Sequence, residues 1–209
     1  QTAVVSFPPY QPISNGVTYI RVYVPPDDNS GNDEAFYAMG VNPGVLSYND
    51  TITFGYSGGI GWFGEGYWLS RYRIDDPNTR IKSIKVKLIG APGSTGQIVR
   101  AVVLDNTGTI VAKSDPYKVK ASDDNTLVTF KVSDPIPYKV PSSSSTFFVG
   151  IEQTAIASSD DAYGIQASQN ETPTREGAYF AAYGMKPVGT QLGLFTWTSR
   201  WRMEAVITS

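Results

Sequence analysis

Residues 83–88 read Ser-Ile-Lys-Val-Lys-Leu, a strict alternation of polar and apolar side chains. Successive side chains of a β-strand point to opposite faces of its sheet, so Ile84, Val86 and Leu88 would share one face. The serine and the two lysines would share the other. The stretch therefore predicts a strand with one buried side and one solvated side.

The same alternation recurs in residues 127–132 and in the C-terminal run 200–207. Each run sets apolar side chains against hydroxyl or charged ones, which is typical of antiparallel sheets that cover a core with one face. The fold class that follows is an all-β, antiparallel, two-sheet β-sandwich. The apolar members are Val128, Phe130, Val132, Trp201, Met203, Ala205 and Ile207, and the polar members are Thr129, Lys131, Arg200, Arg202 and Glu204.

Two further runs, residues 98–104 and 147–151, are nearly all apolar, as expected of central strands. The turn sequence Asp-Asn-Thr-Gly at 105–108 separates the first of them from residues 109–113. This turn predicts a β-hairpin in which Gly108 adopts the left-handed conformation that glycine takes at no steric cost.

The 209 residues are interpreted as one domain, because all-β sandwiches commonly reach about 200–250 residues as a single unit. Within it, residues 18–24 predict an N-terminal strand, which an acidic loop follows. We expect residues 1–43 to form an edge or cover added to a core sandwich of residues 44–209.

Composition excludes several function classes. The net charge of −2 gives no electrostatic footprint for nucleic acid. No apolar run approaches the roughly 18 residues that a membrane span needs, so we expect no membrane insertion. The chain has no Cys and no His, which excludes Ser-His-Asp and Cys-His catalysis and zinc sites built from His or Cys.

Five successive segments resemble a β-sandwich domain of jelly-roll type that occurs in secreted, multidomain proteins of Bacteroidetes. They are Leu-Ser-Tyr-Asn-Asp at 46–50, Gly-Gly-Ile-Gly-Trp at 58–62, the strand 67–74 leading into Ile-Lys-Ser-Ile-Lys-Val at 81–86, Ser-Thr-Phe-Phe-Val-Gly-Ile at 145–151, and Trp-Arg-Met-Glu-Ala at 201–205. The resemblance covers roughly three quarters of the chain.

The resemblance implies a non-catalytic module of an exported or cell-surface protein, delivered by type IX secretion. The C-terminal sorting signal that usually follows in such proteins is not visible, so the export route stays open. A start at Gln1 fits a mature secreted protein or a piece excised from a longer one. Asp50-Thr51-Ile52 resembles the site at which that phylum O-glycosylates exported proteins, with Thr51 as the acceptor.

Residues 56–66 alternate glycines with the adjacent rings of Trp62 and Phe63. In a functional interpretation these rings stack on a sugar, and Glu65 accepts hydrogen bonds from its hydroxyl groups. In a structural interpretation the glycines allow positive φ or close backbone approach before the next strand, and the rings cap the core. Trp197 stands among threonines and a serine, a setting that predicts partial exposure.

The acidic loop after the first strand suggests a calcium site at Asp27, Asp28 and Asp33. Calcium takes six to eight oxygen ligands, and this loop offers several carboxylates within a short stretch. The same residues are equally typical of solvated turns, because Asp and Asn hydrogen-bond to their own backbone. No other cofactor is expected.

Three function classes follow. The first is a non-catalytic extracellular or cell-surface binding or adhesion module, with a polysaccharide or a cell-surface molecule as its partner. The second is a structural spacer or assembly domain of an exported protein. The third is a carboxylate glycosidase, which needs two acidic residues and no histidine. The sequence indicates neither the ligand nor the oligomeric state.

Overall fold

A computed structural model describes residues 16–25, 28, 31, 33–41, 44–48, 56–58, 65–74, 78–89, 95–132, 138–139, 146–154, 164–168, 177–197 and 200–208. The chain divides into two compact units, residues 1–43 and residues 44–209. Among the described residues, no helix is long and apolar enough to cross a membrane.

The N-terminal unit contains a β-hairpin, in which β1 (Gly16–Tyr23) pairs antiparallel with β2 (Glu34–Val41). The strand predicted for residues 18–24 is confirmed, whereas β2 was not predicted. An ion pair between Arg21 and Glu34 joins the two strands.

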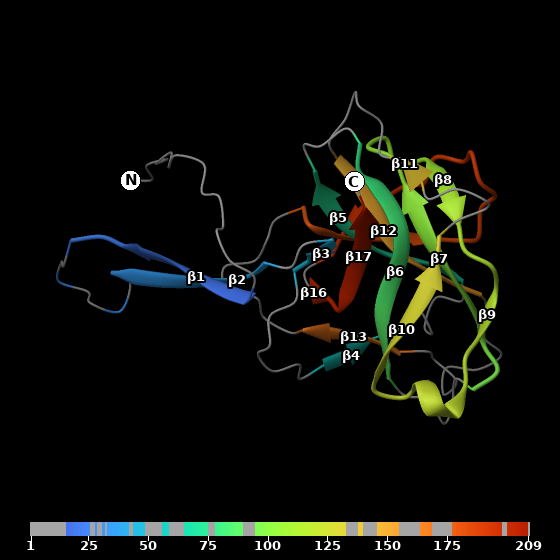
Figure 1. Ribbon diagram of the computed structural model, residues 1–209, viewed down its shortest axis with the longest axis horizontal. Coiled ribbons are helices and arrows are strands. Elements are labelled where there is room, and N and C mark those ends of the chain that lie inside the picture. Colours follow the sequence, from blue (N-terminus) through green and yellow to red (C-terminus); the bar gives the residue numbers. More distant parts are fainter. Residues whose placement is uncertain are drawn as a thin grey trace. The chain divides into compact units, whose positions relative to one another are not determined.

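In the unit formed by residues 44–209, one sheet has the order β16-β13-β6-β17-β3, with β10 and β11 also paired to β6 and β4 paired to β13. Figure 1 shows β6 bordered by β17 on one side and β10 on the other. We call this the first sheet. Its strands are β3 (Val45–Ser47), β4 (Tyr56–Gly58), β6 (Arg80–Ile89), β10 (Thr126–Lys131), β11 (Tyr138–Lys139), β13 (Gly164–Ser168), β16 (Arg200–Trp201) and β17 (Met203–Thr208).

The second sheet has the order β15-β14-β5-β12-β7-β8, with β9 also paired to β7. Its strands are β5 (Gly66–Arg73), β7 (Ile98–Leu104), β8 (Ile110–Lys113), β9 (Tyr117–Lys118), β12 (Thr146–Gln153), β14 (Tyr179–Tyr183) and β15 (Phe195–Thr196). Every strand pair in both sheets is antiparallel. The predicted all-β sandwich is therefore confirmed; η2 (Ala121–Asp123) is the only helical turn in the described part of the chain.

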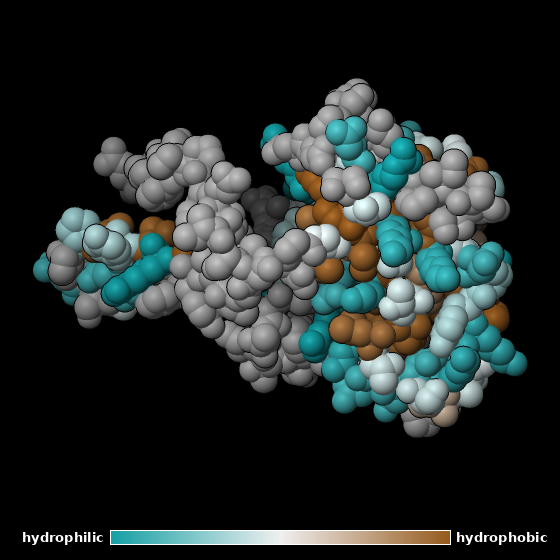
Figure 2. Space-filling view, in the orientation of Figure 1, coloured by the Kyte–Doolittle hydropathy of each residue, from teal (hydrophilic) through white to brown (hydrophobic). Residues whose placement is uncertain are grey.

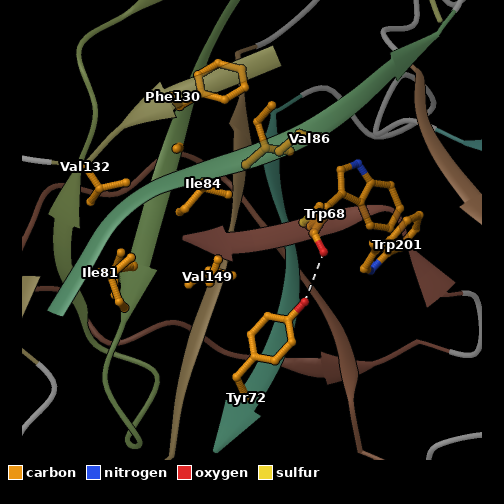
Figure 3. Close-up of a cluster of buried hydrophobic side chains, with 14 of the residues drawn as sticks. Trp68, Tyr72, Ile81, Ile84, Val86, Phe130, Val132, Val149 and Trp201 are labelled. Carbon is orange, nitrogen blue, oxygen red and sulfur yellow. Dashed lines mark hydrogen bonds between the residues drawn. The ribbon is translucent and has the colours of Figure 1, made fainter. Parts of the chain in front are cut away.

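The core lies between the facing sides of the two sheets. Ile84, Val86 and Leu88 of β6 are buried, which confirms the apolar side of the predicted alternation. Ser83, which was predicted on the solvated side, is buried as well, so that part of the prediction is wrong. In Figure 3, Trp68 and Trp201 lie side by side at one end of this core. Each fully buried aliphatic or aromatic side chain of this kind contributes about 1.5–3 kcal/mol. Other members are Tyr72, Ile81, Val99, Ala101, Val103, Phe130, Val132, Phe147, Val149, Ile151, Tyr179, Met203 and Ala205.

Tyr72 carries a polar group into this core and finds a partner there. Its hydroxyl donates to the carbonyl oxygen of Met203 at 3.0 Å, which links β5 to β17 across the sandwich (Figure 3). Burial holds the pKa of Tyr72 well above its ordinary value, because a phenolate would lose its hydration there.

The far side of the first sheet is the wet face. Lys82 and Lys131 are exposed there, on the face opposite the core. Figure 2 shows hydrophilic side chains over much of the visible surface, with apolar atoms among them. One exposed apolar residue on β10 is Leu127.

Arg200 corrects the predicted pattern of the C-terminal run. It was expected on the wet face, but it is buried, and one guanidinium nitrogen donates to the carbonyl oxygen of Tyr48 at 3.1 Å. Burial of a charged group is tolerated where hydrogen-bond acceptors surround it. Alternation alone does not reveal such an acceptor.

The second sheet is covered on both faces. Its outer face carries a second apolar cluster, over which the segment 184–194 passes, and we call this segment the strap. This double cover explains why residues 98–104 and 147–151 are nearly all apolar. The cluster contains Tyr67, Leu69, Val102, Leu104, Ile110, Phe148, Ala182 and Leu192.

The turn between β7 and β8 has the predicted form. Gly108 has a φ of +82°, in the left-handed region, as the turn sequence required. The Asp105 carboxylate accepts hydrogen bonds from the backbone N–H groups of Thr107 and Thr109, at 2.9 and 3.0 Å. It also accepts one from the Thr107 hydroxyl at 2.6 Å. Burial alone would raise the pKa of Asp105, but these hydrogen bonds outweigh it and hold the pKa below its ordinary value.

We predict that Asp105→Asn lowers the free energy of unfolding by about 1 kcal/mol at pH 7, because hydrogen bonds to a carboxylate are stronger than those to an amide. The native pKa of Asp105 lies below the unfolded value of about 3.9. The extra stability is therefore present above that value and is lost as the pH falls through the native pKa. Urea denaturation of the wild-type protein and of Asp105→Asn between pH 2 and pH 7 measures this difference in the free energy of unfolding. A difference independent of pH would contradict this account.

Candidate functional site

Five aromatic side chains form a continuous row that starts at the surface and ends in the core. Tyr183 ends β14, Phe195 begins β15, and Trp197 follows β15, so three of them belong to one margin of the second sheet. Trp68 of β5 and Trp201 of β16 complete the row from the two facing sheets. We call this set the aromatic row.

Ring contacts connect all members of the aromatic row. Tyr183 stacks on Phe195 with ring centroids 4.9 Å apart and an interplanar angle of 29°. Trp197 lies 6.3 Å from Phe195 and 5.2 Å from Trp68, and Trp68 lies 4.2 Å from Trp201. Exposure falls along the row from 50% at Tyr183 to 1% at Trp201. The outer end is thus accessible, and the inner end is part of the core.

The accessible end can bind an apolar surface of modest size. Tyr183 and Phe195 present a stacked pair at which an aliphatic ring face can pack, and the Tyr183 hydroxyl adds a polar group. Farther in, the indole N–H groups of Trp68, Trp197 and Trp201 are buried and have no acceptor among the residues that the structure describes.

Of the residues predicted for ligand binding, Trp62 and Phe63 lie outside the described residues. Trp197 is half-buried, as its polar neighbours indicated. Glu65 is also half-buried, and one of its carboxylate oxygens accepts a hydrogen bond from the Met185 N–H at 3.1 Å. Its carbonyl oxygen accepts another from the Gly184 N–H at 2.9 Å. In the structure Glu65 therefore holds the beginning of the strap.

The glycine-rich stretch has a structural role at Gly66. This residue lies opposite Tyr183 in the β5–β14 ladder. A Cβ atom at Gly66 would overlap the carbonyl oxygen of Ala182, so the two backbones approach more closely than any side chain would allow. For Gly66, the structural interpretation of the glycine-rich stretch is correct.

Tyr183 and Phe195 were not identified from the sequence. A signal was present in Phe195-Thr196-Trp197, where an aromatic, a polar and an aromatic residue alternate. Two-residue periodicity places Phe195 and Trp197 on one face of a strand. Tyr183 had no such local signal, because it reaches Phe195 only through the pairing of β14 with β15.

A buried charged network lies on the outer face of the second sheet, beneath the strap. The Glu152 side chain has no exposed surface, and its carboxylate pairs with Lys113 and, at 3.1 Å, with Arg100. The Tyr67 hydroxyl donates to the same carboxylate at 3.0 Å. A buried carboxylate with two cationic partners is well compensated, whereas removal of one partner from such a pair costs about 3–5 kcal/mol.

Tyr67 connects this network to the strap. Its hydroxyl oxygen accepts a hydrogen bond from the Lys186 N–H at 2.9 Å. The Lys186 carbonyl oxygen accepts one from the Lys113 ammonium at 2.6 Å. Burial, together with the nearby Glu152 carboxylate, raises the pKa of Tyr67 well above its ordinary value. The hydroxyl thus stays protonated and remains a donor over the physiological range.

The predicted calcium ligands are only partly described. Asp27 lies outside the described residues, Asp28 is exposed, and Asp33 is half-buried. Among the residues that the structure describes, no three Asp, Glu, His or Cys side chains are close enough to hold a metal ion. Thr51, the predicted glycosylation site, also lies outside the described residues, and both hypotheses stay predictions.

Comparison with known proteins gives a fold likeness alone. No family model matches the chain, and no curated protein matches it. A structure of the clostridial cysteine protease Cwp84 after propeptide cleavage matches 86% of the chain with a TM-score of 0.56 and 7% sequence identity. A structure of the cysteine protease and lectin-like domains of Cwp84, described as a surface-layer-associated protein of Clostridium difficile, gives a TM-score of 0.48 and 6% identity over 85% of the chain. The matched region covers 44% of the first of these two protein chains and 39% of the second, so this chain spans less than half the length of each.

We predict that the two ends of the aromatic row differ in their contribution to stability. Trp201→Ala should lower the free energy of unfolding by about 3–5 kcal/mol, because it opens a cavity in the core. Tyr183→Ala should cost less than about 1 kcal/mol, because half of that side chain is already in water. Chemical denaturation measures both, with Leu127→Ala as an exposed apolar control. Equal costs at Tyr183 and Trp201 would show that Tyr183 belongs to the core.

Proposed function

We propose that this chain is a non-catalytic binding module of an extracellular or cell-surface protein, and that it binds carbohydrate at the outer end of the aromatic row. The observation that carries the proposal is the Tyr183–Phe195 stack, which is held at the margin of a sheet with Tyr183 half exposed. A pyranose ring has an apolar C–H face that matches such a surface, and hydroxyl groups that suit the neighbouring polar ones.

Nearby residues extend the proposed site. Thr196 is exposed between Phe195 and Trp197 and offers a hydroxyl group at the same margin. Trp62 and Phe63 stay in the proposal because they precede Gly66, the partner of Tyr183, by only a few residues. The net charge of −2 favours a neutral polysaccharide over a polyanion such as nucleic acid.

Two considerations support the extracellular or cell-surface setting. The sequence resembles modules of exported Bacteroidetes proteins, and that resemblance carries the proposals of type IX secretion and of glycosylation at Thr51. The fold is similar to part of Cwp84, a protein described as surface-layer-associated.

A second candidate function is that of an assembly domain. The observation that favours it is the β1–β2 hairpin, on which Ile20, Val22 and Val24 recur at two-residue spacing and are all exposed. A two-stranded hairpin is marginally stable by itself, and exposed apolar side chains at this spacing form one face that would gain from a partner.

We predict that the protein is retained on one or more insoluble polysaccharides and that Tyr183→Ala weakens this retention about tenfold, because a stacked ring contributes roughly 1 kcal/mol beyond its buried area. Trp197→Ala should weaken it as well. Val188→Ala is the matched control, because Val188 is more exposed than Tyr183 and lies on the strap outside the aromatic row.

A panel of neutral and acidic polysaccharides, assayed by pull-down and by release of reducing ends, separates the alternatives. Retention that Tyr183→Ala weakens about tenfold, with little change in melting temperature, supports the binding module. Absence of retention on the whole panel, with self-association in analytical ultracentrifugation, points to the assembly domain. Release of reducing ends by the wild-type protein would support the glycosidase alternative.

A further inference from the structure

The strap begins and ends at the two accessible rings of the aromatic row. Tyr183 precedes its first residue and Phe195 follows its last, and their ring centroids are 4.9 Å apart. A compact surface loop of this length whose ends lie close together is an Ω-loop, a class of loop that is frequently functional. The pairing of β14 with β15 and the path of the strap therefore determine together how the two rings meet.

The half of the strap next to Phe195 is held by the edge of the second sheet. Gly189 N–H donates to the carbonyl oxygen of Ile110 at 2.7 Å, and Leu192 N–H donates to that of Gly108 at 2.9 Å. The Leu192 side chain is buried in the outer apolar cluster. This half depends on backbone pairing and apolar packing.

The half next to Tyr183 is held by Glu65 at its start and by the charged network at Lys186. Only two residues separate Tyr183 from Lys186, whose N–H donates to the Tyr67 hydroxyl and whose carbonyl oxygen accepts from Lys113. Both side chains are fixed in turn by the buried Glu152 carboxylate. The direction in which the chain leaves Tyr183 thus depends on Glu65 and, at Lys186, on three further side chains that do not belong to the aromatic row.

We propose that Tyr67, Lys113 and Glu152 are positioning residues of the binding site: through the Lys186 backbone they set the orientation of Tyr183 against Phe195. The expected effect on binding rests on the proposed function. The dependence of the ring pair on the network does not require that any particular ligand binds.

Tyr67→Phe tests the inference, with Tyr72→Phe as its matched control. Both tyrosines belong to β5, both are buried, and each substitution removes one hydroxyl group. Tyr67 bonds to the strap, whereas Tyr72 bonds to Met203 inside the core. We expect Tyr67→Phe to accelerate hydrogen exchange of the Lys186 amide and to weaken polysaccharide retention, each about fivefold, the effect of one lost hydrogen bond. Tyr72→Phe should change neither, although it lowers the melting temperature.

Nuclear Overhauser contacts between the Tyr183 and Phe195 rings report the geometry without any ligand. Loss of these contacts in Tyr67→Phe, but not in Tyr72→Phe, supports the inference, whether or not the wild-type protein binds polysaccharide. Failure of the wild-type protein to bind any polysaccharide would refute only the proposed function. Unchanged ring contacts in a folded Tyr67→Phe variant overturn the inference. So does retention that falls equally in both variants, because the effect would then be one of general stability.

Glu152→Gln provides a second variant that keeps the side-chain shape and removes the charge. Lys113 then loses its ionic partner, and we expect the same loss of ring contacts with a larger drop in melting temperature. If Glu152→Gln does not fold, Lys113→Met removes the bond to the Lys186 carbonyl oxygen and leaves Glu152 paired with Arg100. Preserved ring contacts in whichever of these variants folds would also overturn the inference.

Discussion

The structure depends on the burial of the second sheet on both of its faces. One face packs against the first sheet through alternate side chains such as Val99, Val149 and Tyr179. The other face carries the remaining alternate positions and would expose them to water without the strap. A sheet of this kind needs two covers, and only one of them can be the partner sheet of a sandwich.

The second cover explains why a fully buried carboxylate is tolerated. Glu152 occupies an outward position on β12, between Tyr67 of β5 and Arg100 of β7, and it is fully buried, so its charge would be prohibitively costly without partners. Lys113 and Arg100 compensate for it from β8 and β7, and the Tyr67 hydroxyl adds a hydrogen bond. The network bonds to the strap through the backbone N–H and carbonyl oxygen of Lys186. Polar groups in this cover therefore determine where the chain runs, while apolar groups supply most of the stabilisation.

Local alternation was sufficient for the fold, because a strand with one wet face carries its orientation in its own sequence. Residues 83–88 predicted β6 and its buried side, and the Asp105–Gly108 turn predicted the β7–β8 hairpin together with the conformation of its glycine. The same pattern predicted the wrong face for Arg200, because its hydrogen-bond acceptor, the Tyr48 carbonyl oxygen, is 152 residues away in the sequence. The second strand of the hairpin, β2, was missed because its residues alternate poorly between polar and apolar.

The candidate site was less predictable than the fold, for a related reason. Trp197 was identified because its polar neighbours suggested exposure, yet Tyr183 becomes significant only once β14 and β15 are paired. Glu152 looked like one acidic residue among several until the pairing of β12 with β7, and of β7 with β8, brought it to Arg100 and Lys113. Burial of alternate residues produces a local periodicity that can be read from the sequence. Contacts between distant segments produce no such periodicity.

The strap has one more consequence, for the behaviour of the protein in concentrated solution. β8 is the last strand along its side of the second sheet, and an uncovered outer strand offers its backbone to any other chain that can add a strand. Carbonyl and N–H groups of the strap occupy that margin at Ile110 and Gly108. A protein whose strap is displaced would therefore expose an unpaired strand edge together with the outer apolar cluster, and we expect intermolecular aggregation to accompany the loss of stability.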